Sequence, residues 1–115
     1  MKINFNQNLL NLDGKRLKIN DRELTLLSIS QNVLVNILTK EDETIASGEK
    51  EDRYNLALKI TIHKEVETEV TAEDIVLLKK LIGKPYIPLV VGQAFLMLEG
   101  RSTGIVEVVD EVKEN

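Results

Sequence analysis

Apolar and polar residues alternate along the first part of the chain, which is the two-residue period of a half-buried strand. The alternation predicts two strands, near residues 2–6 and 15–19, and Leu9, Leu10 and Leu12 are expected either to extend the first strand or to pack beneath the turn. Between them lies Asp13-Gly14, a dipeptide that tolerates the positive φ angles of a tight turn. A second turn is expected at Asn20-Asp21. The N-terminal segment is therefore predicted to form a β-hairpin.

Four stretches of helical periodicity follow the hairpin, and each has a start signal. The predicted starts are Ser28, in a capping box with Gln31, and then Ser47, Thr71 and Pro88. Gly83 is expected to end the third helix in a left-handed conformation, and Gly100 follows the fourth. The polar segment 39–47 predicts a loop. The alternating segment 65–70 predicts a short strand or an extended linker.

The apolar stripes of these helices predict which side chains face the core. The fourth helix, from Pro88 to about Glu99, is apolar almost all round, which is typical of a central helix or of one that a second chain covers. The first of these interpretations is the simpler. In the second helix a wide, mostly buried stripe is expected, with Tyr54, Ala57, Leu58 and Thr61 on one side and Leu56 and Ile60 adjacent. In the third helix the expected inward residues are Ile75, Leu78, Leu81 and Ile82.

Residues 1–100 are expected to form one α+β domain, followed by an acidic, valine-rich tail at 101–115. The tail is interpreted either as an edge strand or as a segment that stays mobile until a partner binds it. Because an exposed strand edge pairs readily with another chain, we predict that the tail contacts a protein. The residues expected to make this contact are Ile105, Val106, Glu107, Val108, Val109, Asp110 and Glu111.

The composition excludes several kinds of chemistry. The 115 residues include no cysteine and a single histidine, His63, so disulfides, thiolate nucleophiles and zinc sites built from Cys or several His residues are excluded. His63 is expected to cap a helix end. No apolar run approaches the roughly 20 residues that a membrane helix needs, and a signal peptide is not evident. We expect a soluble, cytoplasmic protein without a metal or cofactor.

The net charge of −4 is unevenly distributed, with +3 over residues 1–40 and −7 over residues 41–115. The acidic part argues against a nucleic-acid-binding protein, because phosphate contacts need clustered Lys and Arg. A nucleic-acid-associated protein that uses its basic hairpin remains an alternative. The basic residues in question are Lys2, Lys15, Arg16, Lys18 and Arg22.

Two acidic clusters and one basic cluster are candidate ligand sites. The clusters 41–43 and 65–69 lack the oxygen spacing and turn glycine of a calcium loop, so solvated faces are expected. The basic cluster follows the third helix and forms the second alternative function, a small-molecule or anion-binding protein. Its residues are Lys79, Lys80, Lys84 and Tyr86.

An ordered series of short motifs runs through residues 1–100. It consists of Leu12-Asp13-Gly14-Lys15, Leu24-Thr25-Leu26, Ser47-Gly48-Glu49-Lys50, Val70-Thr71-Ala72-Glu73-Asp74-Ile75, Gly83-Lys84-Pro85-Tyr86 and Val90-Val91-Gly92-Gln93-Ala94. In this order they resemble a group of small proteins encoded by tailed phages and prophages. The resemblance implies an accessory or assembly protein that works by contact, without an assigned activity.

The sequence as a whole predicts a hairpin packed on three to four helices, with a C-terminal edge strand as an option. The predicted function is a non-catalytic protein-interaction module, such as an assembly chaperone or an inhibitor of a host factor. Its partner is expected to be another protein or a second copy of the chain. Burial of aliphatic surface would supply affinity, and the acidic regions would steer the module toward a basic partner.

Overall fold

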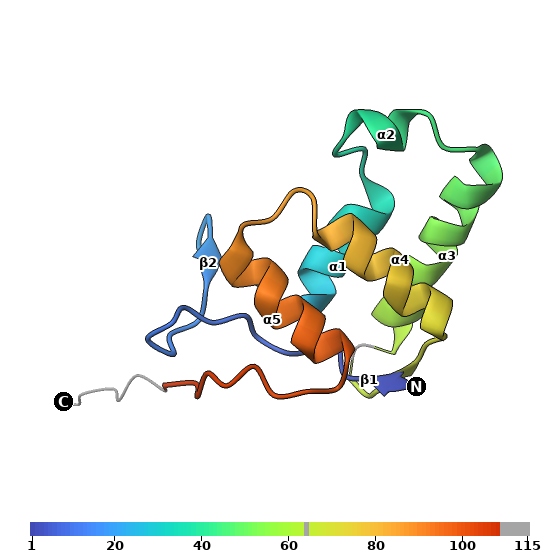
Figure 1. Ribbon diagram of the computed structural model, residues 1–115. Helices are drawn as coiled ribbons and strands as arrows, with labels where there is room; N and C mark the ends of the chain where they lie inside the picture. Colours follow the sequence, from blue (N-terminus) through green and yellow to red (C-terminus); the bar gives the residue numbers. More distant parts are fainter. Residues whose placement is uncertain (64, 109–115) are drawn as a thin grey trace.

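The computed structural model describes residues 1–63 and 65–108 and has the α+β fold that the sequence predicts (Figure 1). Helices account for most of the regular structure, and the strands are short antiparallel pairs. In chain order the elements are β1 (Lys2–Ile3), β2 (Lys18–Ile19), β3 (Arg22–Glu23), α1 (Leu26–Val35), α2 (Lys40–Glu43), α3 (Ser47–Ile62), β4 (Thr68–Glu69), α4 (Ala72–Ile82) and α5 (Pro88–Leu98).

The two strand pairs connect different parts of the chain. β1 pairs with β4, so the N-terminus lies beside the segment that leads into α4 (Figure 1). β2 pairs with β3 through Asn20 and Asp21, whose φ angles of 52° and 65° suit a tight hairpin turn. Segment 65–70 thus contains a strand, one of the two alternatives left open by its alternation.

The turn at Asp13-Gly14 closes a loop of the hairpin region, and Leu9 and Leu10, the expected extension of the first strand, line it in place of residues 2–6. The residues facing Arg16 and Leu17 are Leu10 and Leu9: Leu10 forms a bridge with Arg16, and the Leu17 N–H donates to the Leu9 carbonyl at 2.8 Å. The strand expected at 2–6 instead pairs with β4 through its first residues. The polar residues 6–8 separate the part of the N-terminal segment that pairs with β4 from the part that pairs with Arg16 and Leu17.

α1 begins two residues before the predicted start because its free backbone donors are met there. The Thr25 hydroxyl accepts from the Ser28 N–H at 3.0 Å, and the Ser28 hydroxyl accepts from the Thr25 N–H at 3.0 Å. The next two donors, of Leu26 and Leu27, bind the carbonyls of Gln7 and Phe5 at 2.9 and 2.8 Å. The capping box is therefore Thr25 with Ser28, and the predicted pairing of Ser28 with Gln31 is wrong.

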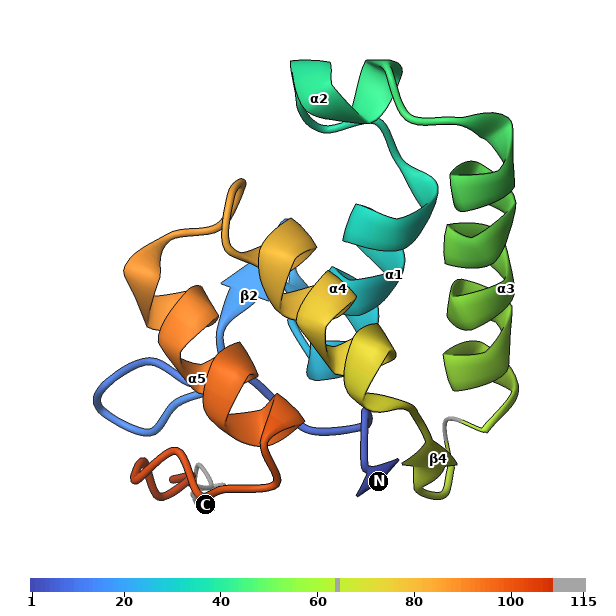
Figure 2. The same ribbon diagram turned by 45° about the vertical axis from the view of Figure 1, so that its right-hand side comes forward.

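The helices pack around α1, which contacts α3 and α4, while α4 also contacts α5 (Figure 2). All four inward residues predicted for α4 are buried. In α3 the predicted stripe is buried at Leu56, Ala57 and Ile60, but Tyr54 and Leu58 are exposed, so the stripe is narrower than expected. The residues of α3 that face inward are Arg53, Leu56, Ala57 and Ile60.

The two predicted glycine stops behave differently. Gly100 has a φ of 71° and follows α5 in a Schellman arrangement: its N–H donates to Met97, and the Arg101 N–H donates to Leu96. Gly83 caps α4 with a φ of −65°, so the left-handed prediction there is wrong. A Cβ at position 83 would lie 3.0 Å from the Lys79 carbonyl and 3.5 Å from the Phe95 ring, so close packing is the role of this glycine.

A buried glutamine ties the hairpin region to α5. Gln93 lies within the apolar helix, and its side-chain oxygen accepts the Leu10 N–H at 2.9 Å. Its amide nitrogen donates to the Leu10 carbonyl at 2.7 Å and to the Leu89 carbonyl at 2.9 Å. The side chain therefore pairs with Leu10 as a neighbouring strand would.

The described part of the tail, 101–108, lies along the hairpin region and contains no regular strand. The Val108 N–H donates to the Gly14 carbonyl at 2.9 Å, and Arg16 Nε binds Glu107 Oε2 at 2.7 Å. The predicted edge strand is thus not formed over these residues, because one backbone bond does not make a ladder. Predicted contact residues Val109, Asp110 and Glu111 lie outside the described residues.

Replacing Gly14 with alanine should destabilise the fold by about 1–2 kcal/mol, the general penalty for an L residue in the left-handed region. Gly14 has a φ of 89°, and an added Cβ would lie 2.4 Å from the Val106 carbonyl oxygen. We therefore also expect loss of the Val108 contact. Urea unfolding measures the first effect, and amide hydrogen exchange at Val108 the second.

The matched control is Gly48→Ala, which adds a Cβ within α3 where nothing lies within 4 Å. This variant should be neutral or stabilised by roughly 0.5–1 kcal/mol, because alanine favours the helix. Equal stability of the Gly14→Ala variant and the wild type, with Val108 still protected, would contradict the role assigned to Gly14.

Candidate functional site

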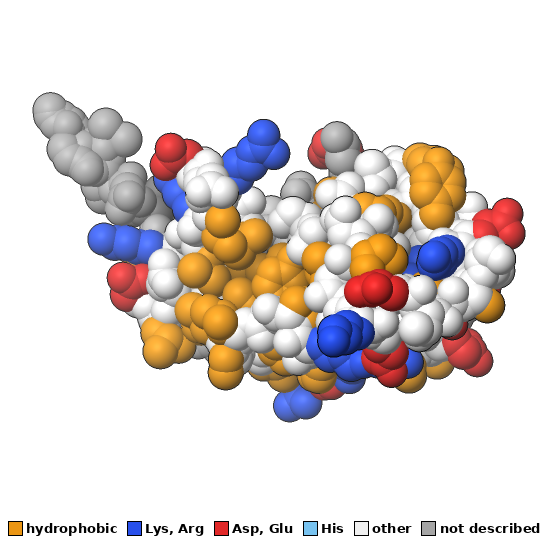
Figure 3. All heavy atoms as spheres, turned by 90° about the horizontal axis from the view of Figure 1, so that it is seen from above, with side chains coloured by type: hydrophobic (Ala, Val, Ile, Leu, Met, Phe, Trp, Pro, Cys, Tyr) orange, Lys and Arg blue, Asp and Glu red, His pale blue; other side chains and the backbone are white. Residues whose placement is uncertain are grey.

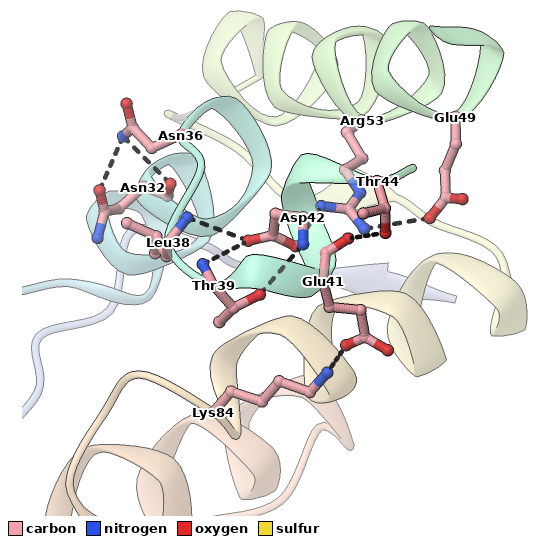
Figure 4. Close-up of polar contacts among 10 residues, drawn as sticks. All are labelled: Asn32, Asn36, Leu38, Thr39, Glu41, Asp42, Thr44, Glu49, Arg53 and Lys84. Atoms are coloured by element: carbon pink, nitrogen blue, oxygen red, sulfur yellow. Dashed lines mark hydrogen bonds and ion pairs between the residues drawn. The ribbon is translucent and has the colours of Figure 1, made fainter. Parts of the chain in front are cut away.

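The connector between α1 and α3 contains a short helix, so the loop predicted over 39–47 is only partly correct. Thr39 caps α2: its hydroxyl accepts from the Asp42 N–H at 3.2 Å (Figure 4). In return Asp42 Oδ2 accepts from the Leu38 and Thr39 N–H groups at 3.1 and 3.3 Å. The carboxylate of Asp42 thereby holds the chain that leaves α1.

Asp42 is also one half of a buried ion pair, with Arg53 of α3 as the other half (Figure 4). Arg53 Nη1 donates to Asp42 Oδ1 at 3.0 Å, and Arg53 Nη2 donates to Glu49 Oε2 at 3.1 Å. Asp42 and Arg53 are only 5% and 4% exposed. The solvated face predicted for segment 41–43 is therefore wrong at Asp42, since a buried charge needs a partner and Arg53 supplies it.

The surroundings of Asp42 favour its charged form. Burial by itself raises the pKa of this carboxyl, but the hydrogen bonds from Arg53 and Leu38 outweigh burial and leave the pKa below its ordinary value. The pKa of Asp42 is lower in the folded state than in the unfolded chain, so the folded state favours the charged carboxylate. Asp42 therefore stabilises the fold at pH values above its pKa in the unfolded chain. That contribution is lost as the pH falls through the lower pKa of the folded state.

One nitrogen of Arg53 has no hydrogen-bond partner in the part of the chain that the structure describes. This nitrogen is Nε, and it is buried. A buried donor without an acceptor costs about 1–3 kcal/mol.

A pocket lies beside this arginine, between the end of α1 and the start of α3. Its volume is about 150 Å³, well below the roughly 300–1,000 Å³ of pockets that take drug-sized ligands. Apolar side chains dominate the wall, and two basic side chains and one amide complete it. The lining residues are Leu34, Val35, Asn36, Ile37, Ile45, Lys50, Arg53 and Tyr54.

The rim of the pocket is apolar and open to solvent. Val35, Ile37 and Tyr54 line it and are each more than half exposed, and Leu38 next to it is also exposed. Exposed apolar side chains around a concavity are typical of interaction sites. The pocket is sized for a single side chain.

Sequence reasoning missed Arg53, although a signal was present. Arg53 lies on the same helical face as Leu56 and Ile60, so the apolar stripe of α3 continues through a charged residue. A charged residue on a buried stripe requires a counter-charge, and Asp42 lies eleven residues upstream. The pairing itself depends on how α2 folds back onto α3.

The structure places the four residues of the predicted anion site against different elements. Lys79 binds Glu99 at 2.5 Å and lies over the Phe95 ring, whereas Lys84 pairs with Glu41 of α2 (Figure 4). The Tyr86 hydroxyl accepts from Asn32 of α1 at 2.8 Å, and Lys80 is exposed on α4. The charges of Lys79 and Lys84 are thus engaged within the protein, and the anion site stays a prediction.

The tail and the basic hairpin meet around Arg16. Arg16 donates hydrogen bonds to Glu107 and Glu23, and these bonds raise its pKa, so its charge is held by two carboxylates. Lys15 and Lys18 line an open, polar hollow of about 500 Å³ beside them. Of the tail residues predicted to bind a partner, Ile105 and Glu107 are half-buried, whereas Val106 and Val108 are exposed.

The remaining predicted sites lie at the surface. His63 occupies the C-cap of α3, near the helix end as expected. Glu65 and Glu67 are exposed, and Glu69 binds the Met1 amino group at 2.6 Å. Within residues 1–63 and 65–108, Asp, Glu and His side chains form no group of three or more that could hold a metal ion. In the same part of the chain, no helix is long and apolar enough to cross a membrane.

Comparisons of this chain with protein-family models, with curated proteins and with solved structures find no match. The candidate site therefore rests on its own geometry: an apolar pocket with an open rim, closed on one side by a buried arginine.

Proposed function

We propose that this protein is a non-catalytic protein-interaction module, which takes an apolar side chain of its partner into the pocket between α1 and α3. The observation that carries the proposal is the pocket's apolar, exposed rim of Val35, Ile37 and Tyr54. Covering a half-exposed aliphatic side chain contributes about 1 kcal/mol, so these side chains favour association. The ion pair of Asp42 and Arg53 keeps the wall in place.

The volume of the pocket supports a polypeptide partner. About 150 Å³ accommodates one side chain, whereas cofactors and drug-sized ligands bury most of their surface in larger cavities. Recognition of one anchoring side chain with apolar neighbours is a common way in which interfaces concentrate their binding energy.

We further propose a role as a phage accessory protein in the host cytoplasm, which the resemblance of the motif order to small phage and prophage proteins supports. An assembly chaperone or an inhibitor of a host factor works through such contacts. The exposed tail residues Val106 and Val108 form a second contact surface in this proposal, beside the hairpin.

The test is selection of binding peptides from a random display library, followed by measurement of their affinity for two variants. Ile37→Asp puts a charge into the pocket, and we expect at least a tenfold loss of affinity. Ile87→Asp is the matched control, since both isoleucines lie outside helices and are 53% and 60% exposed. The affinity of this control should stay within about twofold of wild type, because Ile87 does not line the pocket. A tenfold loss corresponds to about 1.4 kcal/mol of binding free energy.

The control also examines a second apolar surface. Seen from the α2 side of the molecule, apolar side chains gather around a hollow in the left half of the view, where the β2–β3 hairpin and the α4–α5 connection lie in Figure 1 (Figure 3). Loss of binding in Ile87→Asp with retention in Ile37→Asp would move the site to that surface. The Gly14→Ala variant in the same assay reports on the contribution of the tail.

A further inference from the structure

The outer face of α4 is apolar in its middle and charged at both ends. Val76 is 67% exposed there and Leu77 is half-buried, and an open hollow of about 370 Å³ lies over them. Glu73 precedes this pair and Lys80 follows it, and both are exposed. These residues together with Ala72 line the hollow and are called the α4 face. None of them lines the pocket of the proposed function, so the α4 face is a separate surface.

The two charges of the α4 face lie on one side of the helix but cannot bind each other. Seven residues separate Glu73 from Lys80, which is two helical turns or about 10.5 Å along the axis. Within residues 1–63 and 65–108, neither of them forms an ion pair with another side chain. The α4 face therefore presents one negative and one positive charge, at a fixed spacing, on either side of an aliphatic centre.

A second copy of the same face is complementary to this arrangement. A rotation of 180° about an axis that is perpendicular to α4, midway between Val76 and Leu77, turns the helix end for end. It places Glu73 of each copy opposite Lys80 of the other, with the aliphatic side chains of both copies in contact between the two pairs. A surface that is complementary to itself about a two-fold axis is what an isologous dimer requires.

The neighbouring edge of α3 has the same order of charges. A second hollow, of about 400 Å³, lies between this edge and α4, and its lining includes Asp52, Leu56 and Lys59 of α3 together with Leu77. Asp52 and Lys59 are again seven residues apart, and in the described part of the chain neither forms an ion pair. Because α3 and α4 run in roughly opposite directions, the rotation that reverses α4 also reverses α3 (Figure 2). The charges of both helices therefore favour the same axis.

We propose that two copies of this chain form a two-fold dimer in which their α4 faces pack against each other in antiparallel orientation. Covering Val76 and Leu77 supplies the affinity, and the pairs of Glu73 with Lys80 fix the register. A contact centred on two helices of 11 residues covers less surface than a standard protein interface. The dimer is therefore weak, with a dissociation constant in the micromolar to millimolar range.

Sedimentation equilibrium of the full chain, from about 20 µM to about 1 mM, measures the dimer. Glu73→Lys and Lys80→Glu each turn both attractive contacts into repulsive ones, and each should weaken self-association by about fivefold or more. In an equimolar mixture, one variant has two positive charges on its α4 face and the other has two negative charges, so attraction returns at both contacts. The mixed dimer should therefore be about fivefold tighter, or more, than the dimer of either variant alone.

The signs of these effects distinguish specific pairing from general repulsion between acidic molecules. Glu73→Lys makes the chain less negative, so general repulsion alone would strengthen its self-association. Glu51→Lys is the matched control, since it makes the same change at an exposed acid of α3 outside both hollows, and its dimer should stay within about twofold of wild type. A wild-type chain that stays monomeric up to about 1 mM, or a mixture no tighter than the separate variants, would overturn the proposal.

The aliphatic centre is tested by Val76→Asp, which places two carboxylates against each other at the two-fold axis. We expect loss of the dimer over the whole concentration range, with an unchanged circular dichroism spectrum because Val76 is exposed. Ile62→Asp is the matched control, since Ile62 is a 65% exposed aliphatic residue of α3, and this variant should dimerise like wild type. Survival of the dimer in Val76→Asp would overturn the α4 face as the interface. Binding of the selected peptides to Val76→Asp should stay at the wild-type level, so this test and that of the proposed function fail independently.

Discussion

Replacing Arg53 with methionine should lower the free energy of unfolding by about 3–5 kcal/mol, the usual cost of removing one partner from a buried ion pair. Methionine fills similar space but leaves the carboxylate of Asp42 buried without its counter-charge. The segment after α1 would loosen as well, because Asp42 also holds the N–H groups of Leu38 and Thr39. Urea unfolding followed by circular dichroism measures the change.

Glu49→Gln is the matched control, because it removes the charge of the second partner of Arg53, whose side chain is 44% exposed and therefore partly solvated. Its effect should stay below about 1 kcal/mol, as is typical of exposed pairs. The double variant Arg53→Met with Asp42→Asn should recover part of the loss, since a neutral amide is less costly to bury than an unpaired charge. A free energy of unfolding of Arg53→Met within about 1 kcal/mol of wild type would contradict the importance of the Asp42–Arg53 pair.

The same pair predicts the sign of a pH effect. Asp42 has a pKa below the ordinary 3.8, so its stabilising contribution is complete above that value and disappears as the pH falls below it. In Arg53→Met the main group that lowers this pKa is gone. Burial then raises the pKa of the unpaired carboxyl, so the difference in unfolding free energy between wild type and variant should begin to narrow above pH 3.8 and should continue to narrow as the pH falls through the lower pKa of the wild type. A difference that stays constant over this range would argue against an electrostatic origin.

Replacing Gln93 with leucine should cost about 2–3 kcal/mol. The change keeps the volume and the apolar character of α5, but it leaves the buried N–H and carbonyl of Leu10 without their partners. A buried polar group that loses its hydrogen bond costs about 1–3 kcal/mol. Urea unfolding gives the total effect, and the amide of Leu10 should exchange with solvent faster than in wild type.

Gln31→Leu serves as the matched control for this substitution. Gln31 is also a helical glutamine, but its side chain binds only the Thr61 hydroxyl, which already donates to the Ala57 carbonyl. Its loss should therefore remain below about 1 kcal/mol. If Gln93→Leu proved as mild as this control, Leu10 would have to find another partner, and the link between the hairpin region and α5 would be less important than we infer.

Helix starts show where reasoning from sequence succeeded and where it did not. Thr71 with Asp74 is a correct capping box, because Thr68, the hydroxyl three residues before it, lies in strand β4. Thr25 and Ser28 are three residues apart and both have capping side chains, so the local pattern allows two starts. The carbonyls of Phe5 and Gln7, distant along the chain, bind the donors that select Thr25.

The candidate site depended still more on distant parts of the chain. Ile37 and Tyr54 look like ordinary surface or core residues in sequence, and the pocket exists only because α2 returns the chain toward α3. Arg53 is buried because that return brings Asp42 to it. The interaction surface predicted in the tail was chosen from composition, and the pocket was not among the expected sites.

The sequence by itself determined the fold class, the inward stripe of α4, and the extent of α5 between Pro88 and Gly100. These features follow from side chains and backbone groups within one or two helical turns, where spacing decides the outcome. The tertiary structure alone decided the β1–β4 pairing, the burial of Arg53 with Asp42, and the pocket beside them. These features depend on groups that are many residues apart in the sequence. The packing of the whole core brings such groups together, so no fixed spacing along the chain predicts their contact.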